Sequence, residues 1–345
     1  MAAPSIRTLR RDEREAWLEL LDGWELGDGW RGRDFFRRPL ERDPTFEDEN
    51  VWVATEGGRL VSCVQIFPRR LRVRGAAVPT GGIGSVFTRP EARGSGVASA
   101  LLERTLAAMR ERGMELSLLF AARHAFYGRL GWGLWPRSRP LLLRAEGTAP
   151  AVRAGDRFDP ARDLAEVAAL HAAYSSPFDG TVVRDAAQWQ ASLVLAGNPR
   201  EEFLVAREGG GGIAAYARTI VLEGFFLIAE WARRPDGADA LAALVAGLLT
   251  PREEDPLERP GRPSSELRKL LVAPTPPDAE LYAALERRGI DVKHFDERGA
   301  MLQCLDADAL ARRLDEPRRS GEDPGAFLER MIPHDRFCFW PSDRF

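Results

Sequence analysis

The alternation of apolar and polar residues predicts a mixed helix-and-strand fold for the first part of the chain. Residues 7–23 carry leucines at helical spacing, which predicts an amphipathic helix. Residues 50–87 are rich in β-branched and aromatic side chains, and the glycines at 57–58 indicate a hairpin turn between the first two strands. An apolar stripe over residues 97–112 predicts a long helix, and a buried strand is expected over 114–122.

The second part of the chain repeats a coarse order of helix, strand pair, strand, helix and strand, without a sequence repeat. Residues 147–160 are rich in Ala, Gly and Pro, which is typical of a domain boundary. Periodicity predicts helices over 161–174 and 237–249, and a glycine turn at 209–212 joins two of the strands between them. After a polar linker at 315–325, the remaining residues form an aromatic tail suited to burial.

Length and composition predict a globular protein of two ordinary domains. The chain has 345 residues, of which 44% are hydrophobic and 29% charged, and its formal net charge is −3. This composition excludes a disordered chain and gives no basic excess that would favour nucleic acid as the main partner. Three cysteines and four scattered histidines provide neither a disulfide framework nor a metal site. No signal peptide or membrane-spanning run is evident, so we expect a cytoplasmic protein.

The turn between the strand ending at residue 87 and the helix at 97–112 carries the candidate chemistry. It reads Arg93-Gly94-Ser95-Gly96-Val97-Ala98. A helix begins with unpaired N–H groups and a partial positive charge, so it attracts anions, and glycine allows a phosphate to approach the backbone closely. On glycine spacing alone, an ordinary structural turn is the simpler interpretation. The P-loop pattern is absent.

The order of motifs favours a phosphate-binding role, because Arg93–Ala98 resembles the R/Q-x-x-G-x-G/A signature of GCN5-related N-acetyltransferases (GNAT). About thirty residues later, Phe126-Tyr127-Gly128-Arg129-Leu130-Gly131-Trp132 is similar to that family's F-Y-x-x-x-G-F segment. The element order further resembles the enhanced-intracellular-survival (Eis) group, in which an active domain precedes a degenerate second one. The group's sterol-carrier-like third domain is expected to be shortened or absent here.

The resemblance implies an α/β (α+β) protein with tandem GNAT folds, each a mixed, mostly antiparallel sheet flanked by helices. It implies a catalytic domain over residues 1–146, a second, degenerate GNAT-like domain over 147–314 and a C-terminal tail over 315–345 that returns to the active site. It also implies acetyl-CoA as co-substrate and no metal. The implied cofactor-binding residues are Val86, Phe87, Thr88, Arg93, Gly94, Ser95, Gly96, Val97, Ala98, Ser99, Ala122 and Arg123.

Two catalytic groups follow from the same resemblance. The hydroxyl of Tyr127 is implied as the general acid that protonates the leaving thiolate, and the α-carboxylate of Phe345 as the base. A packed aromatic residue and a tail buried only for stability are the structural alternatives. Asp28, Trp30 and Phe36 are candidate substrate-binding residues, with core packing as the alternative for the aromatic pair.

The sequence departs from the Eis group at two places. Ala122 and Arg123 stand where that group usually has Ser-Glu, and Arg344 lies beside the terminal residue, where an acid would suit a polycationic aminoglycoside. We therefore expect an N-acetyltransferase that acts on a primary amine of a small molecule or a lysine side chain by direct transfer in a ternary complex. The alternatives are a CoA-binding regulatory protein without catalysis, and an acyltransferase with another acyl-CoA or a protein substrate. The resemblance also implies a trimer or hexamer.

Overall fold

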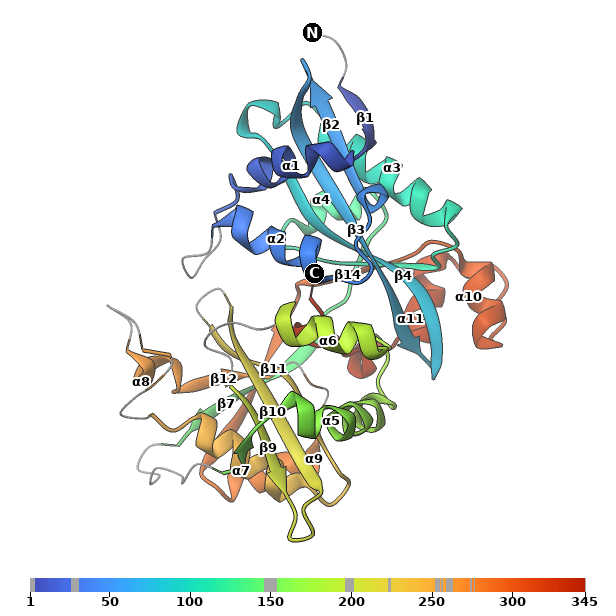
Figure 1. The fold of residues 1–345 in the computed structure, drawn as a ribbon. Helices are drawn as coiled ribbons and strands as arrows, with labels where there is room; N and C mark the ends of the chain where they lie inside the picture. The colour runs from blue at the N-terminus through green and yellow to red at the C-terminus, as the bar shows by residue number, and fades with distance from the viewer. Residues whose placement is uncertain are drawn as a thin grey trace.

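Two mixed sheets of seven strands each form the centres of two halves that lie one above the other (Figure 1). The computed structural model describes residues 4–25, 31–145, 154–195, 202–222, 225–251, 255, 257–258, 263–273, 275 and 277–344. Each sheet combines mainly antiparallel neighbours with a parallel pair, and helices cover both. The predicted fold class, two mixed and mostly antiparallel sheets flanked by helices, is confirmed.

The first sheet has the strand order β1-β2-β3-β4-β5-β14-β6. The predicted glycine turn lies between β2 and β3, where Gly57 and Gly58 adopt positive φ angles. The long hairpin of β3 and β4 comes next in the chain and forms the centre of the sheet. The strands are β1 (Ser5–Thr8), β2 (Val51–Glu56), β3 (Arg59–Val73), β4 (Ala76–Thr88), β5 (Leu116–Phe120), β14 (Ala300–Cys304) and β6 (Gly133–Leu134).

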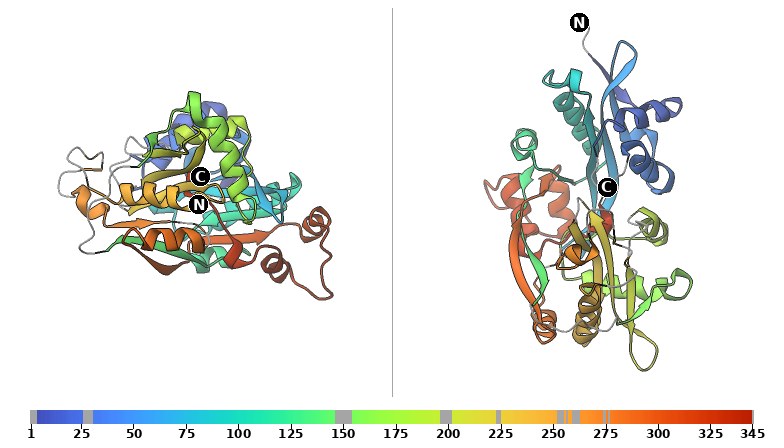
Figure 2. Two further views of the ribbon diagram at one scale, coloured as in Figure 1. Left: turned by 90° about the horizontal axis from the view of Figure 1, so that it is seen from below. Right: turned by 90° about the vertical axis from the view of Figure 1, so that its left-hand side faces the viewer.

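Helices cover the two faces of this sheet with different cores. α1 (Arg14–Leu21) and α2 (Gly32–Arg42) lie on one face, and α3 (Val97–Glu111) lies on the other (Figure 2). The α1 side buries residues such as Trp17 and Phe87, whereas the α3 side buries Ile66 and Leu102. The short helix α4 (His124–Gly128) follows β5.

The second sheet has the order β13-β7-β12-β11-β10-β9-β8 and repeats the plan of the first. An antiparallel pair, β10–β11, is followed by a helix and a parallel strand, as β3–β4 is followed by α3 and β5. The strands are β7 (Arg137–Arg144), β8 (Asp156–Arg157), β9 (Phe203–Arg207), β10 (Ile213–Leu222), β11 (Phe225–Arg233), β12 (Leu270–Val272) and β13 (Ile290–Glu297), and the helices are α5 (Pro160–Ser175), α6 (Ala186–Leu195), α7 (Ala238–Leu248), α8 (Ser264–Leu267) and α9 (Ala279–Glu286).

The two halves exchange strands. β7 follows directly on the first half in sequence, yet it pairs with β12 and β13 in the second sheet. Conversely, β14 comes after the second half and pairs with β5 and β6 in the first sheet. A cut at residue 146 therefore separates β7 from the second sheet and β14 from the first, whereas no described strand lies beyond residue 314. The proposed domain boundaries stay a prediction from the sequence.

The tail returns to the junction of the two halves. After α10 (Ala307–Leu314), helix α11 (Pro324–Met331) buries Phe327 and Met331 against the first half. The indole N–H of Trp340 donates to Ser175 Oγ of α5 at 3.2 Å. Phe337, Phe339 and Trp340 are at most 2% exposed, so the aromatic tail is buried as its composition predicted.

The start of the chain differs from the sequence prediction. Residues 5–8 form strand β1, antiparallel to β2, and α1 begins only at Arg14. The leucines that suggested a helix from residue 7 all lie within α1, so the helical periodicity was real but its start was placed too early. The long helix predicted over 97–112 is confirmed as α3.

Candidate active site

The glycine turn before α3 is open on the side where a ligand would sit. Gly94 and Gly96 have φ angles of 81° and 84°, in the left-handed region that glycine adopts without strain. A Cβ built on either would meet nothing within 4 Å. Gly96 caps α3, and no side chain caps the helix's first N–H groups. The turn thus presents a run of N–H donors at the positive end of a 15-residue helix, which suits an anion.

The residues around the glycines shape this turn rather than fill it. Arg93 is exposed and its Nε donates to the carbonyl of Thr88 at 3.1 Å, while Ser95 Oγ donates to the carbonyl of Ala92 at 2.7 Å. Val97, the first residue of α3, is buried, whereas Ala98 and Ser99 lie half-buried in the first turn of the helix. Arg93 is therefore placed beside the turn with its charge toward solvent.

The first sheet opens next to this turn. β4 and β5 pair in parallel only from Thr80–Leu116 to Ile83–Leu119, although β4 continues to Thr88. Beyond Ile83, no described strand lies along this edge of β4, so its backbone groups face a gap. Such a gap between two parallel strands leaves backbone N–H and C=O groups of β4 available to bind a ligand that contains amide groups.

A bulge in β4 sets which residues face the gap. Ser85 has a φ of 49°, the pairing with β3 shifts there, and its hydroxyl donates to Gln65 Oε1 at 2.9 Å inside the core. After the bulge, Phe87 pairs with Cys63. Since backbone groups alternate along a strand, those of Val86 and Thr88 point away from β3 toward the gap. The predicted trio of Val86, Phe87 and Thr88 thus includes two residues whose backbone faces the opening.

Tyr127 lies in α4, on the segment that leaves β5 beside the gap. Its ring packs edge-on against Phe126 at 4.9 Å and Trp132 at 6.1 Å between centroids. Trp132 is itself fixed, because its indole N–H donates to Ser117 Oγ of β5 at 3.1 Å, and Ser117 donates to the carbonyl of Gly81 in β4. Burial raises the pKa of Tyr127 above its usual value, opposed by the positive charge of Arg123. The phenol is therefore protonated at neutral pH.

The other predicted residues near β5 lie just beyond its end. Ala122 and Arg123 are exposed and follow the end of β5, with Arg123 at the start of α4. Arg344 of the tail lies with its guanidinium carbon 4.7 Å from the centre of the Phe120 ring, and Phe339 packs on the same ring. Arg344 of the tail therefore contacts the end of β5. The next residue, Phe345, lies outside the described residues.

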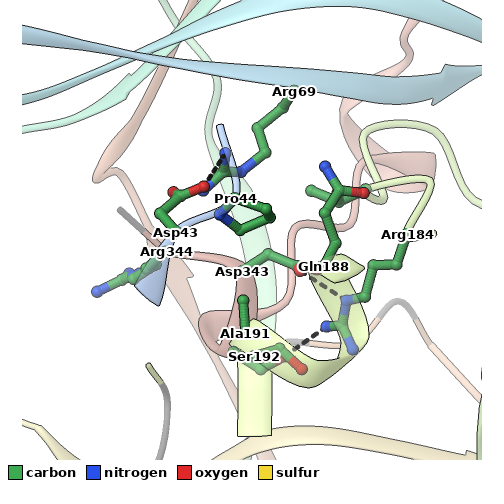
Figure 3. Close-up of a pocket in the computed structure, with 11 residues that line it drawn as sticks. Asp43, Pro44, Arg69, Arg184, Gln188, Ala191, Ser192, Asp343 and Arg344 are labelled. Atoms are coloured by element: carbon green, nitrogen blue, oxygen red, sulfur yellow. Dashed lines mark hydrogen bonds and ion pairs between the residues drawn. The ribbon is translucent and has the colours of Figure 1, made fainter. Parts of the chain in front are cut away.

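The pocket that the tail forms with α2, β3 and α6 lies on the opposite face of the sheet from α3. We call it the tail pocket; Figure 3 shows its main part, and a second hollow continues it along α2. Two ion pairs cross it, from Arg69 to Asp43 at 2.6 Å and from Arg184 to Asp343 at 2.7 Å. It is lined by Phe35, Arg38, Pro39, Asp43, Pro44, Phe67, Arg69, Val182, Arg184, Gln188, Ala191, Ser192, Ser342, Asp343 and Arg344.

Of the three predicted substrate-binding residues, only Phe36 lies in the described part of the chain. Asp28 and Trp30 lie outside the described residues. Phe36 is 7% exposed and packs on Trp24 in the core, so it does not line the tail pocket, whereas the adjacent Phe35 does. Sequence reasoning missed Asp43, Arg69 and Arg184, because no spacing connects residues that only the fold brings together.

The second half has no comparable turn before its corresponding helix. Gly237, which precedes α7, has an ordinary φ of −86°, and a Cβ there would lie 2.5 Å from the carbonyl oxygen of Ala214. That helix start is therefore closed by packing. Within the described ranges, no three His, Cys, Asp or Glu side chains are grouped to hold a metal ion, and no helix there is long and apolar enough to cross a membrane.

The first sheet thus splits beside a helix start that suits an anion. Residues 5–135 match the family model described as an acetyltransferase (GNAT) domain. Members of this family transfer an acyl group from coenzyme A to an amine. The predicted resemblance to the GNAT family is confirmed for residues 5–135.

Related proteins and structures agree with this assignment. An "Uncharacterized N-acetyltransferase" of Streptomyces griseus is 33% identical over 196 residues, which are 54% of this chain and 46% of the relative, so the match spans about half the length of that relative. A GCN5-related N-acetyltransferase from Kribbella flavida superposes with a TM-score of 0.63 at 20% identity, covering 89% of this chain and 72% of the other. Eis1 from Mycobacterium abscessus superposes with a TM-score of 0.60 at 20% identity, covering 90% and 76%. These structural likenesses show the fold.

Proposed function

We propose that this protein transfers the acetyl group of acetyl-CoA to a primary amine of a small molecule or a lysine side chain, directly within a ternary complex. The observation that carries the proposal is the open glycine turn at Gly94 and Gly96 beside the gap between β4 and β5. The turn's N–H groups would hold the pyrophosphate, and the free edge of β4 would hold the amide-containing arm. No described group at the start of α7 offers the same arrangement.

The acyl carbon would lie where the gap meets the tail pocket. The donor enters from the α3 side, and the tail pocket opens on the α2 side of the same sheet, next to Phe120 at the end of β5. An amine in the tail pocket could attack through the gap. Holding both reactants across one sheet replaces a bimolecular encounter with an oriented one.

Tyr127 would act as the general acid. As the nitrogen–carbon bond forms and the carbon–sulfur bond breaks, the sulfur gains negative charge and needs a proton. The raised pKa of Tyr127 keeps the phenol protonated, so it can supply that proton. Trp132 and Phe126 hold the ring in place for this transfer.

The α-carboxylate of Phe345 would act as the base that takes a proton from the acceptor's ammonium group, which gives the neutral amine that attacks the thioester. Its support is the position of Arg344, which reaches the end of β5. Adding a glycine after Phe345 moves the carboxylate by about 3.8 Å. We expect kcat to fall roughly tenfold or more with unchanged affinity for CoA. Phe345→Leu, which keeps the carboxylate in place, is the control, and an equal loss in both variants would argue against the base role.

The proposed function is tested by release of free thiol from acetyl-CoA with a panel of amines, alongside calorimetric titration of CoA. We expect CoA to bind and at least one amine to stimulate thiol release. Tight CoA binding without thiol release from any amine would favour a regulatory role instead. Thermal-shift competition among acyl-CoAs of different length tests the donor, since Saccharomyces cerevisiae N-myristoyltransferase with bound myristoyl-CoA shares the fold at a TM-score of 0.57, 14% identity, 88% of this chain and 83% of the other.

A further inference from the structure

The chain segment that carries Tyr127 connects two strands across a third strand from a distant part of the sequence. β5 precedes this segment and β6 follows it, and β14 lies between these two strands in the sheet and pairs with both. The chain adds β14 only after the second half. The position of Tyr127 therefore depends on a strand that lies outside the motif containing it.

Two polar side chains of this part of the sheet lie beneath α4. Ser117 of β5 and Gln303 of β14 are direct partners in the antiparallel pairing of the two strands. Side chains of directly paired residues point to the same face of a sheet. Met301, two residues before Gln303, belongs to the core on which Tyr127 packs, so this face is the one that α4 covers. We call Ser117 and Gln303 the polar pair.

The hydroxyl of Ser117 holds the indole of Trp132. It accepts from the indole N–H at 3.1 Å and donates to the carbonyl of Gly81 at 3.0 Å. Ser117 and Trp132 are at most 2% exposed, so their hydrogen bond is shielded from water. Because the indole packs edge-on against the ring of Tyr127, these hydrogen bonds fix the surface on which the phenol rests.

Gln303 holds the backbone that follows Tyr127. Its Nε2 donates to the carbonyl of Leu130 at 3.3 Å. The N–H groups of Leu130 and Trp132 in turn donate to the carbonyl of Tyr127, at 3.0 and 3.3 Å. A Cβ on Gly131, whose φ is 101°, would overlap Gln303 Nε2, so glycine lets the chain approach the amide this closely. One side chain of β14 is thus connected to Tyr127 through a single turn of backbone.

The hydrogen bonding of Gln303 provides position more than stability. Its Oε1 is buried and accepts no hydrogen bond from any described residue. Burying an amide oxygen without a donor costs at least as much free energy as one hydrogen bond contributes, so the side chain adds little net stability. An apolar side chain of the same length would fill this space without that cost. What such a side chain lacks is the donor that fixes Leu130.

We propose that Gln303 and Ser117 are positioning residues for the acetyl transfer, and that they set the distance between the Tyr127 hydroxyl and the leaving sulfur. This rests on the proposed function with Tyr127 as the general acid. Gln303 acts through the backbone of Leu130, and Ser117 acts through the indole of Trp132. Proton transfer needs its two partners within hydrogen-bond reach, so a displacement of about 1 Å is enough to slow the reaction.

The test is a double-mutant cycle with Tyr127→Phe. In the otherwise native protein we expect Gln303→Met, which keeps the length of the side chain but removes the donor, to lower kcat roughly tenfold or more. The Kd of CoA should stay unchanged, because the glycine turn at Gly94 and Gly96 belongs to β4 and α3 rather than to α4. In Tyr127→Phe, the same substitution should change the residual kcat less than about twofold, since no acid remains to be positioned. Ser117→Ala should behave in the same way.

Cys304→Ala is the control on the same strand. Cys304 follows Gln303 in β14, but its side chain faces the opposite core, which contains Phe327. We expect this truncation to lower thermal stability without lowering kcat. A loss of kcat equal to that of Gln303→Met would mean that any loosening of β14 slows the reaction, and it would overturn the inference.

The outcomes separate this inference from the proposed function. If the native protein releases thiol and either Gln303→Met or Ser117→Ala leaves kcat unchanged, that residue has no positioning role and the acetyltransferase function stands. The inference also fails if both substitutions lower kcat as strongly in Tyr127→Phe as in the native protein, because their effect is then not exerted through Tyr127. If no amine stimulates thiol release by the native protein, the proposed function fails and the inference with it.

Discussion

Tyr127 is held in place by aromatic packing, and its hydroxyl makes no hydrogen bond with any described residue. Tyr127→Phe should therefore leave the fold and CoA affinity unchanged while removing the proton donor. We expect kcat to fall by about 10²- to 10⁴-fold, the usual contribution of general acid catalysis. Steady-state thiol release together with CoA titration measures both quantities.

Tyr282→Phe is the matched control for this substitution. The Tyr282 hydroxyl is buried in the second half and has no hydrogen-bond partner among the described residues, so its loss should change neither kcat nor CoA affinity. Equal activities of the Tyr127 variant and this control would remove Tyr127 from the catalytic mechanism.

The pH dependence of the reaction follows from the same residue. Burial raises the pKa of Tyr127 above its ordinary value near 10, and the phenol acts in its protonated form. Its contribution to kcat is therefore complete at low and neutral pH and is lost only as the pH rises beyond that ordinary value. We expect the kcat profile to show no descending limb below about pH 10. A descending limb near neutrality that disappears in Tyr127→Phe would contradict this.

At the scale of single residues, the sequence predicted a glycine turn at the start of a long helix, and the structure contains that turn. The roles of its residues stay predictions. Gly94 and Gly96 have the open, positive-φ geometry that the motif implied. The tail pocket could not be predicted, because Asp43, Arg69 and Arg184 come from separate segments and meet only in the fold. The sequence also did not show that Phe36 packs in the core while the adjacent Phe35 lines the tail pocket, and the substrate-binding role of Phe36 stays a prediction.

At the scale of elements, the two glycines at the ends of α3 allow a controlled test of the proposed binding turn. Gly96 begins the helix and Gly113 follows its end, with φ angles of 84° and 70° and open space around both. Alanine at either position should cost about 1–2 kcal/mol of stability through the left-handed backbone alone. Only Gly96→Ala also places a methyl group at the turn where the pyrophosphate would bind.

We therefore expect Gly96→Ala to weaken CoA binding by roughly tenfold or more, and Gly113→Ala to leave it unchanged, at similar losses in thermal stability. Calorimetric titration and thermal unfolding of both variants measure these effects. Equal CoA affinities in the two variants would place the coenzyme elsewhere.

The sequence also predicted single helices and turns better than it predicted which strands pair with each other. The 97–112 helix and the glycine hairpin were correct because local periodicity and turn chemistry determine them. The strand β1 at Ser5–Thr8 was missed, since four residues are too few to show alternation and the pairing with β2 decides the outcome. The bulge at Ser85 likewise depends on Gln65, twenty positions away.

At the scale of the whole molecule, Glu297 of β13 pairs with Arg137 and Arg139 of β7, the strand that connects the first half to the second sheet. Burial acts to raise the pKa of Glu297, but the attraction of Arg137 and Arg139 outweighs it and lowers the pKa to about 2. Glu297→Gln would leave two buried guanidinium groups without a carboxylate, and we expect it to lower the free energy of unfolding by roughly 3–5 kcal/mol. Chemical denaturation measures this loss.

The same ion pairs make the free energy of unfolding depend on pH. Because the folded pKa of Glu297 lies below its ordinary value near 4.5, its contribution is complete above that value and is lost as the pH falls toward 2. The stability difference between the native protein and Glu297→Gln should therefore shrink between about pH 5 and pH 2. Asp239→Asn, an exposed partner of two arginines, should change stability little at any pH. A pH-independent difference for Glu297→Gln would contradict this account.

The exchange of β7 and β14 was beyond sequence reasoning, because each strand pairs with partners more than a hundred residues away. It has a consequence for how the protein is made. On the ribosome, the apolar strand β5 keeps an unpaired edge until residues 300–304 have been translated, long after the turn and Tyr127 have emerged. The sheet of the first half therefore stays incomplete until most of the second half has been synthesised. Termination of translation before residue 300 would release a chain whose first sheet has an exposed, aggregation-prone edge.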